Sequence, residues 1–409
     1  MPEWEGTSCS DRSALGHSHK INPNITELDP EAKRLSIEET ESGGNPQGLR
    51  TFSVRCRPNF ANKASTNPDC SDVLRDAGLK RLLIVLPFLF VCRLWAQEYP
   101  HAEISSGIVA ATLMLPDVQN GSYRGTRFDW SGVISSLRFN GHEYFGRWYE
   151  HHDPKIHDAI TGPVEEFRTN DEGLGYKEAK VGGTFVRIGV GTVRKPAEKD
   201  YRPYDTYEIV DPGRWTLRRH RNRIEFTHRL TSDLGYAYVY RKTVRLVEGQ
   251  PALVLEHSLK NTGKKAIDTT QYNHNFFVID HETVGPDLVV KFAFVPAATR
   301  GFKGRAETGG KEIRFPRELI GRNGVFSELT GSEKVVKDYD FRVENLKSGA
   351  GVHISGNQPL ERVNFWAIST VAAVEPYIHL NIAPGKTARW TVRYDFYTLQ
   401  PQAQSRVSR

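Results

Sequence analysis

Cysteine is absent from residues 97–409 of this 409-residue chain. All four cysteines lie at or before Cys92, whereas all 16 tyrosines and 12 of the 14 histidines lie after residue 96. Residues 97–409 therefore cannot contain a disulfide, a thiolate metal site or a cysteine nucleophile. The chain consists of two unlike parts that meet near residue 96.

Excess charge of one sign is also scarce. The first part has 12 Lys/Arg against 12 Asp/Glu, so residues 97–409 hold the whole net charge of +6. Spread over a segment of that length, six charges do not form the concentrated basic surface that nucleic acid requires. We therefore expect no nucleic-acid partner.

No apolar run is long enough to span a membrane stably. Leu82–Cys92 is an eleven-residue run that follows Lys80 and Arg81 and precedes Ala96. As a helix it spans about 16 Å, half of the hydrocarbon core. A cationic start, a short apolar middle and a small residue are typical of a secretory signal. We interpret residues 80–96 as that signal, with a buried strand as the alternative, and expect a secreted or periplasmic protein.

Apolar periodicity is missing before this signal. Residues 1–74 are rich in Ser, Asn, Pro, Glu and Arg, and contain three aromatic residues. Such a segment buries too little apolar surface to offset its chain entropy. We expect residues 1–79 to be a disordered extension, either genuine or, as we prefer, the product of a start codon assigned too far upstream. Residues 97–409 are expected to form a single domain.

Helical stripes are lacking from that domain, and alternation takes their place. Ala388–Phe396 alternates apolar and polar residues, which is typical of a half-buried strand. Pro384-Gly385 suits a type II turn, so Tyr377–Ile382 and Ala388–Phe396 are predicted to form a hairpin. Further strands are predicted at Ile108–Leu115, Val133–Phe139, Thr184–Val193, Ile224–Leu230, Tyr236–Val247, Leu253–Leu259, Ala266–Ile279, Leu288–Val295 and Gly351–Ser355. The sequence therefore predicts an all-β fold, a large antiparallel β-sandwich.

One polar segment lies inside this strand-rich sequence. In Gln271–Phe277, Asn273, His274 and Asn275 follow one another, and such side chains are costly to bury unpaired. On a strand His274 faces away from Asn273 and Asn275. Histidine transfers protons near neutral pH, and a neighbouring amide such as Asn273 can fix its tautomer. The alternative is a satisfied core histidine.

Glu375 ends the apolar run Val371–Val374 and is followed by Pro376. Burial there would raise the pKa of its carboxyl group into the range of a general base. The alternative is a strand-end glutamate in water.

A third cluster, Glu150–Asp158, is rich in histidine and acid residues. It has no His-Glu-x-x-His helix and no cysteine, and His151 and His152 would point in opposite directions on a strand. We predict no metal site, and keep a sugar-facing loop containing His157 and a solvated polar loop as alternatives.

Aromatic and cationic residues elsewhere can stack on or clamp a sugar. Together with His157 and Asn273, the candidates for substrate binding are Arg127, Arg147, Trp148 and Trp366, with Trp130 as a further one. Each has core packing as its alternative.

Two motifs resemble one family. Lys260–Gly263 ends a strand in an Asn turn, and Thr270–Phe277 contains an Asn-His dipeptide before an aromatic pair. Val374–Pro376 and then Ile382–Lys386 follow, before a closing aromatic strand. In this order the segments resemble the aldose 1-epimerase, or galactose mutarotase, family, and the likeness covers residues 105–398.

The resemblance implies a β-supersandwich in which a histidine and a glutamate face each other across the sugar. Carried over by motif, His274 would protonate the ring oxygen, and Glu375 would take the proton of the anomeric hydroxyl. Ring opening, rotation and closure then give the other anomer, with neither metal nor cofactor. The resemblance therefore implies a mutarotase-type isomerase with a carbohydrate as its partner.

The chain also departs from the family. A Gly-Gly followed by His-Gly has only a loose counterpart in His157 and Gly162-Pro163, and the family's sugar-binding aspartate has no clear counterpart. We therefore expect a different substrate, such as a sugar derivative, an oligosaccharide end or an acid sugar. A polysaccharide lyase or other glycan-processing enzyme, and a non-catalytic carbohydrate-binding protein, use the same fold and stay open. Neither the sugar nor the oligomeric state follows from the sequence.

Overall fold

The computed structural model describes residues 99–197 and 200–399. The predictions for residues 1–79 and 80–96 lie outside these residues. Within the described part, no helix is long and apolar enough to cross a membrane. The strands are β1 His101–Ser105, β2 Val109–Met114, β3 Val133–Phe139, β4 His142–Phe145, β5 Gly162–Arg168, β6 Thr184–Arg187, β7 Gly191–Arg194, β8 Ile209–Asp211, β9 Arg214–Arg219, β10 Arg223–Thr231, β11 Ala237–Leu246, β12 Ala252–Asn261, β13 Ile267–Phe276, β14 Leu288–Phe292, β15 Ala297–Ala298, β16 Glu307–Gly309, β17 Glu312–Arg314, β18 Val325–Thr330, β19 Asp340–Asn345, β20 Ala350–Gly356, β21 Arg362–Ile368, β22 Val371–Ile382 and β23 Thr387–Thr398.

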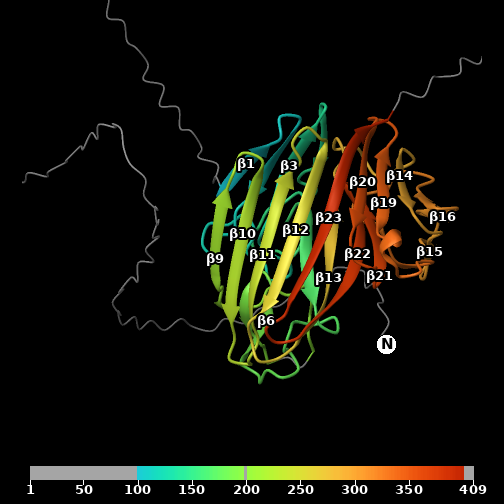
Figure 1. Ribbon diagram of the computed structural model, residues 1–409. Helices are drawn as coiled ribbons and strands as arrows, with labels where there is room; N and C mark the ends of the chain where they lie inside the picture. Colours follow the sequence, from blue (N-terminus) through green and yellow to red (C-terminus); the bar gives the residue numbers. More distant parts are fainter. Residues whose placement is uncertain (1–98, 198–199, 400–409) are drawn as a thin grey trace, which may run out of the picture. The chain divides into compact units, whose positions relative to one another are not determined.

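Two large sheets dominate the fold (Figure 1). The ten-stranded sheet has the order β16-β17-β14-β19-β20-β23-β12-β11-β10-β9, and the six-stranded sheet has the order β15-β18-β21-β22-β13-β5. Their strand pairings are antiparallel. Smaller sheets, β1-β2-β3-β4 and β6-β7-β8, complete the architecture. The predicted all-β antiparallel sandwich is confirmed.

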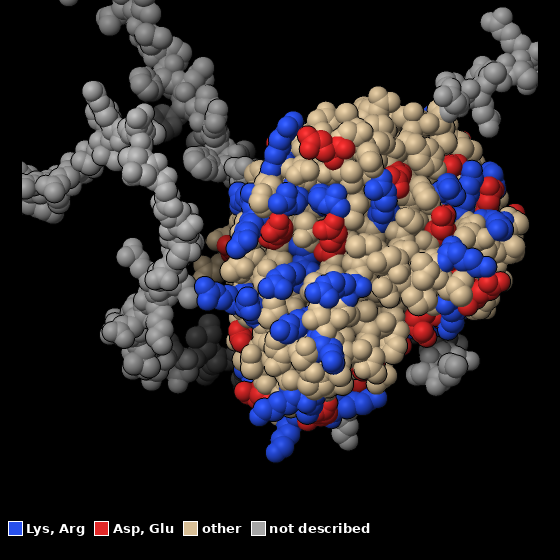
Figure 2. All heavy atoms as spheres, in the orientation of Figure 1, with Lys and Arg blue, Asp and Glu red and all other residues tan. Residues whose placement is uncertain are grey.

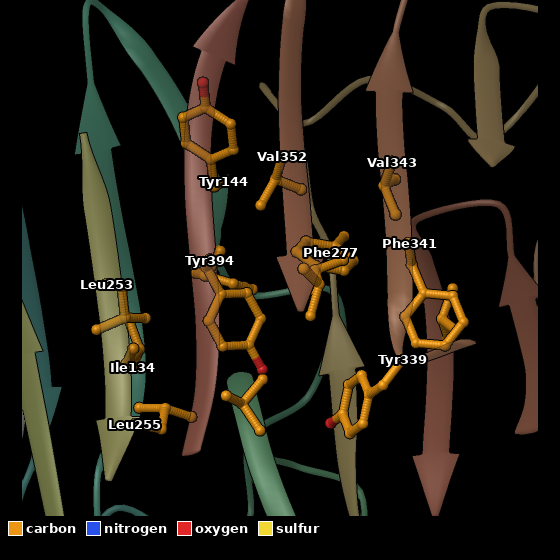
Figure 3. Close-up of a cluster of buried hydrophobic side chains, with 14 of the residues drawn as sticks. Ile134, Tyr144, Leu253, Leu255, Phe277, Tyr339, Phe341, Val343, Val352 and Tyr394 are labelled. Carbon is orange, nitrogen blue, oxygen red and sulfur yellow. The ribbon is translucent and has the colours of Figure 1, made fainter. Parts of the chain in front are cut away.

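The core lies where the inner faces of the two large sheets meet. Figure 3 shows Leu253 and Leu255 of β12, Tyr394 of β23 and Phe341 of β19 directed into it. All four side chains are fully buried. Around Phe341 and Tyr394 buried side chains alternate with exposed or half-buried ones, which is the pattern of a half-buried strand, whereas Ala252–Leu255 of β12 is buried throughout.

The predicted hairpin between Tyr377–Ile382 and Ala388–Phe396 is wrong. Both segments are strands, but β22 pairs with β13 and β21, whereas β23 pairs with β12 and β20. The Pro384-Gly385 turn forms as expected, with Gly385 at a φ of 78° and a 3.0 Å bond from the Lys386 amide to the Ala383 carbonyl. The turn carries the chain from one sheet to the other. The pairing was not predictable, because alternation in the sequence shows which face of a strand is buried but not which strand lies beside it.

The predicted single strand Thr184–Val193 is also wrong, since it is the hairpin β6–β7. Gly189 and Gly191 both have positive φ, at 80° and 152°, which reverses the chain between the two strands. The other predicted strands overlap strands of the structure.

The outward face of the ten-stranded sheet is basic over β9–β12 and β23. Figure 2 shows Lys and Arg side chains gathered on that face. Arg214, Arg229, Arg241, Lys260 and Arg389 all lie there on these strands and are exposed. We call these five the basic sheet face.

A network of charged groups lies inside the sandwich. Glu165 of β5 is fully buried and contacts the ammonium group of Lys242, a ring nitrogen of His257 at 3.1 Å and the amide of Asn273 at 2.9 Å. Burial acts to raise the pKa of Glu165, but Lys242 and His257 together hold it below its usual value. The network is therefore a buried ion pair whose carboxylate also accepts hydrogen bonds from uncharged neighbours.

The fully buried His228 makes the stability of the domain depend on pH. It stacks on Trp215, its Nε2 donates to the Pro212 carbonyl at 2.9 Å, and its Nδ1 accepts from the Tyr238 hydroxyl at 3.0 Å. Burial lowers its pKa from 6.5 to about 4. As the pH falls, His228 binds its proton at a higher pH in the unfolded chain than in the folded one. The stability that it contributes above pH 6.5 is therefore lost as the pH falls towards 4, by about 3 kcal/mol.

His228→Gln keeps both hydrogen bonds and does not titrate, so the free energy of unfolding of this variant, measured with denaturant, should fall less steeply over that pH range. An identical pH dependence in parent and variant would contradict this assignment.

Candidate active site

One pocket of about 220 Å³ opens beside β13, β21 and β22. It is lined by Arg127, Trp148, His157, Asp158, Arg168, Tyr204, His274, Phe276, Arg322, Phe326, Asn364, Trp366, Glu375 and Tyr377. The lining combines a His–Glu pair, an aromatic wall and several guanidinium groups.

Strand register brings His274 and Glu375 together. The β13–β22 ladder runs from Ile267↔Ile382 to Tyr272↔Tyr377, and the bridge Phe277↔Ala372 continues the same register. His274 therefore stands opposite Glu375. Its Nε2 lies 3.2 Å from the Glu375 Oε1, and both side chains are buried. The two groups touch, which differs from the arrangement across a sugar ring that the family resemblance implies.

Burial sets the protonation state of this pair. It lowers the pKa of His274 well below 6.5, and the positive charge of Arg127 acts in the same direction. Burial also raises the pKa of Glu375 above 4.5. At neutral pH the imidazole is therefore neutral, and Glu375 is a stronger base than a carboxylate in water. The His274 Nδ1 is buried and has no hydrogen-bond partner in the described part of the chain.

Glu375 is oriented by two polar neighbours. Asn364 lies opposite it on β21 and donates from Nδ2 to Oε2 at 3.3 Å. The Tyr377 hydroxyl lies 3.4 Å from the same oxygen. These contacts leave Oε1 for His274.

Aromatic rings enclose the histidine. His274 stacks on Phe276 with ring centroids 3.8 Å apart, and Phe276 stacks in turn on Trp148 at 5.2 Å. Trp366 meets His274 edge-on at 5.7 Å. Such faces exclude water and provide the flat apolar surfaces on which sugar rings pack.

Three arginines converge on one buried carboxylate behind the pocket. Glu166 accepts from the Nε of Arg127 at 2.9 Å, from the Nε of Arg168 at 2.8 Å and from the Nη2 of Arg187 at 3.3 Å. Burial opposes ionisation of Glu166, but the three guanidinium groups hold its pKa well below 4.5. The Arg127 Nη2 also donates to the Tyr272 hydroxyl at 3.0 Å. Three positive charges against one carboxylate leave the pocket wall positive.

The structure brings most of the predicted site residues together. His274, Glu375, Arg127, Trp148, His157 and Trp366 all line the pocket. Asn273 does not, because alternation on β13 turns it into the sandwich, where it donates to Glu165. Arg147 does not either, because its guanidinium donates to the carbonyls of Tyr149 and Glu150 outside the pocket.

The histidine-rich loop divides in the same way. His157 and Asp158 line the pocket, whereas His151 is exposed and His152 contacts the Ser122 carbonyl. In residues 99–197 and 200–399 no group of three or more His, Cys, Asp or Glu could hold a metal ion. Trp130 is buried and donates to the Gly125 carbonyl, away from the pocket.

Sequence reasoning missed Arg168, Asn364 and Tyr377. Arg168 reaches the pocket because β5 pairs with β13, where Arg168 stands opposite Thr270. Asn364 and Tyr377 depend on the β21–β22 and β13–β22 pairings. The sequence did indicate Tyr377, because it follows Glu375 by two positions and residues two apart on a strand point to the same face.

No protein-family model and no curated protein matches the chain. Among solved structures, it is similar to an Escherichia coli K12 protein provisionally assigned as an aldose 1-epimerase, with 12% identity, a TM-score of 0.46 and coverage of 73% of this chain and 99% of that one. It is also similar to a galactose mutarotase-like protein from Lactobacillus casei, with 11% identity, a TM-score of 0.45 and coverage of 73% and 100%. A third is an aldose epimerase homologue from C. elegans, with 14% identity, a TM-score of 0.43 and coverage of 74% and 100%. The descriptions of these three proteins name the family that the Asn-His and Glu-Pro motifs resemble.

Proposed function

We propose that the protein is an exported carbohydrate-active enzyme of mutarotase type, which interconverts sugar anomers through His274 and Glu375. The single observation that carries the proposal is the contact between these two side chains, 3.2 Å apart in a pocket lined by aromatic rings. A paired acid and base with pKa values displaced in opposite directions suits proton transfer.

The contact suggests how one sugar could use both groups. The ring oxygen and the anomeric hydroxyl are bonded to the same carbon, so a sugar lying over the pair can present one oxygen to each group. Glu375 removes the hydroxyl proton and passes it to His274 across their contact, while His274 gives a proton to the ring oxygen and the C1–O5 bond opens. The imidazole therefore stays neutral throughout. After rotation, closure runs these transfers in reverse, which restores both groups without an outside base.

Substrate binding would rest on the surrounding residues. Trp148, Phe276 and Trp366 offer stacking surfaces, and Asn364 and His157 offer hydrogen bonds at the rim. Arg127 keeps its Nη1 without a protein partner in the described residues, so it can bind a sugar oxygen.

A lyase acting on uronic acids is the second candidate, favoured by Arg127 and Arg168 beside the pair. These cations could hold the carboxylate next to which a proton is removed. Arg147, a predicted sugar-binding cation, lies outside the pocket and so does not serve this role.

One panel assay separates the candidates. Fresh α-anomers of neutral aldoses and uronic acids are followed by polarimetry, and uronate oligosaccharides by the absorbance of unsaturated products. Accelerated mutarotation supports the proposal, and unsaturated product supports the lyase. Binding in calorimetry without either reaction would contradict both and leave a carbohydrate-binding protein.

Export is part of the proposal and rests on residues 80–96. Expression of the full chain in a bacterial host should give an exported protein whose first residue lies near Gln97, as read by N-terminal sequencing. A chain lacking residues 1–74 should be exported equally well. Retention of those residues in the exported protein, or loss of export without them, would contradict this account.

A further inference from the structure

A second pocket adjoins the candidate active site. It measures about 380 Å³ and shares Arg322, Phe326 and Trp366 with the first pocket. Trp366 contacts His274 edge-on, so the residues shared by the two pockets lie next to the proposed catalytic pair. A chain-like ligand with one unit at His274 can therefore continue past Trp366 into the second pocket.

The second pocket is cationic. Arg300, Lys303 and Arg305 line it together with Arg322, and no acidic residue is among its lining residues. In the described part of the chain, Arg300, Lys303 and Arg305 form no ion pair, and the Arg305 Nε is buried without a hydrogen-bond partner. Arg322 alone is paired, with Asp158 at 3.3 Å on the side of the first pocket. Unpaired cations in a concave site attract anions.

The loop that carries these cations is held in shape. Residues 299–306 connect β15 and β16, and Gly301, Lys303 and Gly304 adopt positive φ values of 60°, 52° and 70°. The amides of Thr299 and Gly301 donate to the carbonyls of Glu328 and Ala298. A left-handed lysine is costly for a surface loop without a role, and here it places its side chain at the pocket.

Aromatic surface accompanies the charge. Phe326 is 46% exposed although it lies on β18, and the Arg300 guanidinium stands 6.0 Å from its ring centre. An exposed ring between two pockets offers a stacking face for a sugar ring, and the neighbouring guanidinium suits an acidic substituent on that ring.

We propose that this second pocket is a subsite for an anionic glycan, which binds the carboxylate or sulfate group of the sugar next to the unit held at His274 and Glu375. The inference rests on the proposed function and narrows its substrate to the end of an acidic oligosaccharide. A carboxylate presents two oxygens in one plane and a sulfate presents oxygens in a tetrahedron, and guanidinium groups bind both. Arg127 and Arg168 line the first pocket, so the preference for negatively charged groups extends into it.

Binding is the measurement that tests this subsite, because it does not require turnover. Calorimetry compares a uronic-acid tetrasaccharide, a sulfated tetrasaccharide and the neutral tetrasaccharide on the purified protein. We expect an acidic chain to bind tighter than the neutral one, and the better of the two identifies the anion. Arg300→Gln/Lys303→Gln should weaken that binding roughly tenfold, with little change for the neutral chain.

Arg241→Gln on the basic sheet face is the control for a general loss of positive charge, since Arg241 is exposed, forms no ion pair within residues 99–197 and 200–399, and lies far along the sequence from this loop. It should leave binding unchanged. Equal binding of acidic and neutral chains, or an equal loss in Arg241→Gln, would overturn the subsite. Tight acidic binding without any anomer interconversion would keep the subsite and reject the proposed reaction, so the two failures are distinguishable.

Discussion

Glu375→Gln and His274→Asn should each reduce turnover by roughly 10²–10⁴-fold, which is the usual contribution of a positioned acid or base. Glutamine keeps an oxygen for Asn364 and Tyr377 but cannot accept the hydroxyl proton. Asparagine keeps a polar group near Glu375 but cannot carry a proton to the ring oxygen. Polarimetry on the best substrate of the panel measures both variants. Substrate affinity should change less than turnover, since aromatic and hydroxyl contacts remain.

The pH profile gives a second measure of the same pair. Burial raises the pKa of Glu375 and lowers that of His274, so turnover should fall on the acid side as the Glu375 carboxylate becomes protonated. This acid limb should disappear in Glu375→Gln.

A control histidine lies on the same strand as Glu375. His379 of β22 pairs with Asp268 at 2.7 Å, and its side chain is about half exposed. His379→Asn removes a His–carboxylate contact of the same kind outside the pocket and should leave turnover unchanged. Undiminished activity in Glu375→Gln or His274→Asn, with a folded domain by circular dichroism, would reject the role of that residue.

The candidate pair could be predicted because its signal is local. His274 lies in a run of polar residues within a strand, and Glu375 ends an apolar run before a proline, so each stands out in its own segment. Alternation along the strand also places His274 and Asn273 on opposite faces, so the prediction that Asn273 binds substrate is at odds with the prediction for His274. The structure shows that the strand turns its amide inward to Glu165.

The cationic part of the site could not be predicted in the same way. Arg127, Glu166 and Arg168 meet because a loop before β3 packs against β5 and β5 pairs with β13. Sequence alternation does not encode which strands are neighbours. The hairpin predicted at Pro384-Gly385 is wrong for the same reason: the turn forms as predicted, but its two flanking strands pair with other strands.

Removing Lys242 alone should destabilise the domain by about 3–5 kcal/mol, because it leaves the fully buried Glu165 without its cation. Lys242 of β11 also donates to the Ser131 carbonyl at 2.9 Å, so its loss leaves a second acceptor unsatisfied. Asp129 lies close by, and burial raises its pKa to about 7. An ionised Glu165 without Lys242 is therefore unfavourable in this buried region, which already disfavours the charged form of Asp129. Lys242→Met keeps the length of the side chain and isolates the loss of charge, and urea unfolding at pH 7.5 measures the free energy.

A double variant separates lost charge from lost packing. In Lys242→Met/Glu165→Gln both ionic groups are gone, and the glutamine can still bond to Asn273 and His257. The double variant should therefore recover most of the stability that the single variant loses, since replacing a whole buried ion pair is far less costly than breaking it. If the double variant is as unstable as Lys242→Met, the destabilisation comes from packing around β11 and not from a buried charge. If Lys242→Met itself unfolds at the same urea concentration as the parent, the ion pair contributes nothing to holding β5 and β11 together.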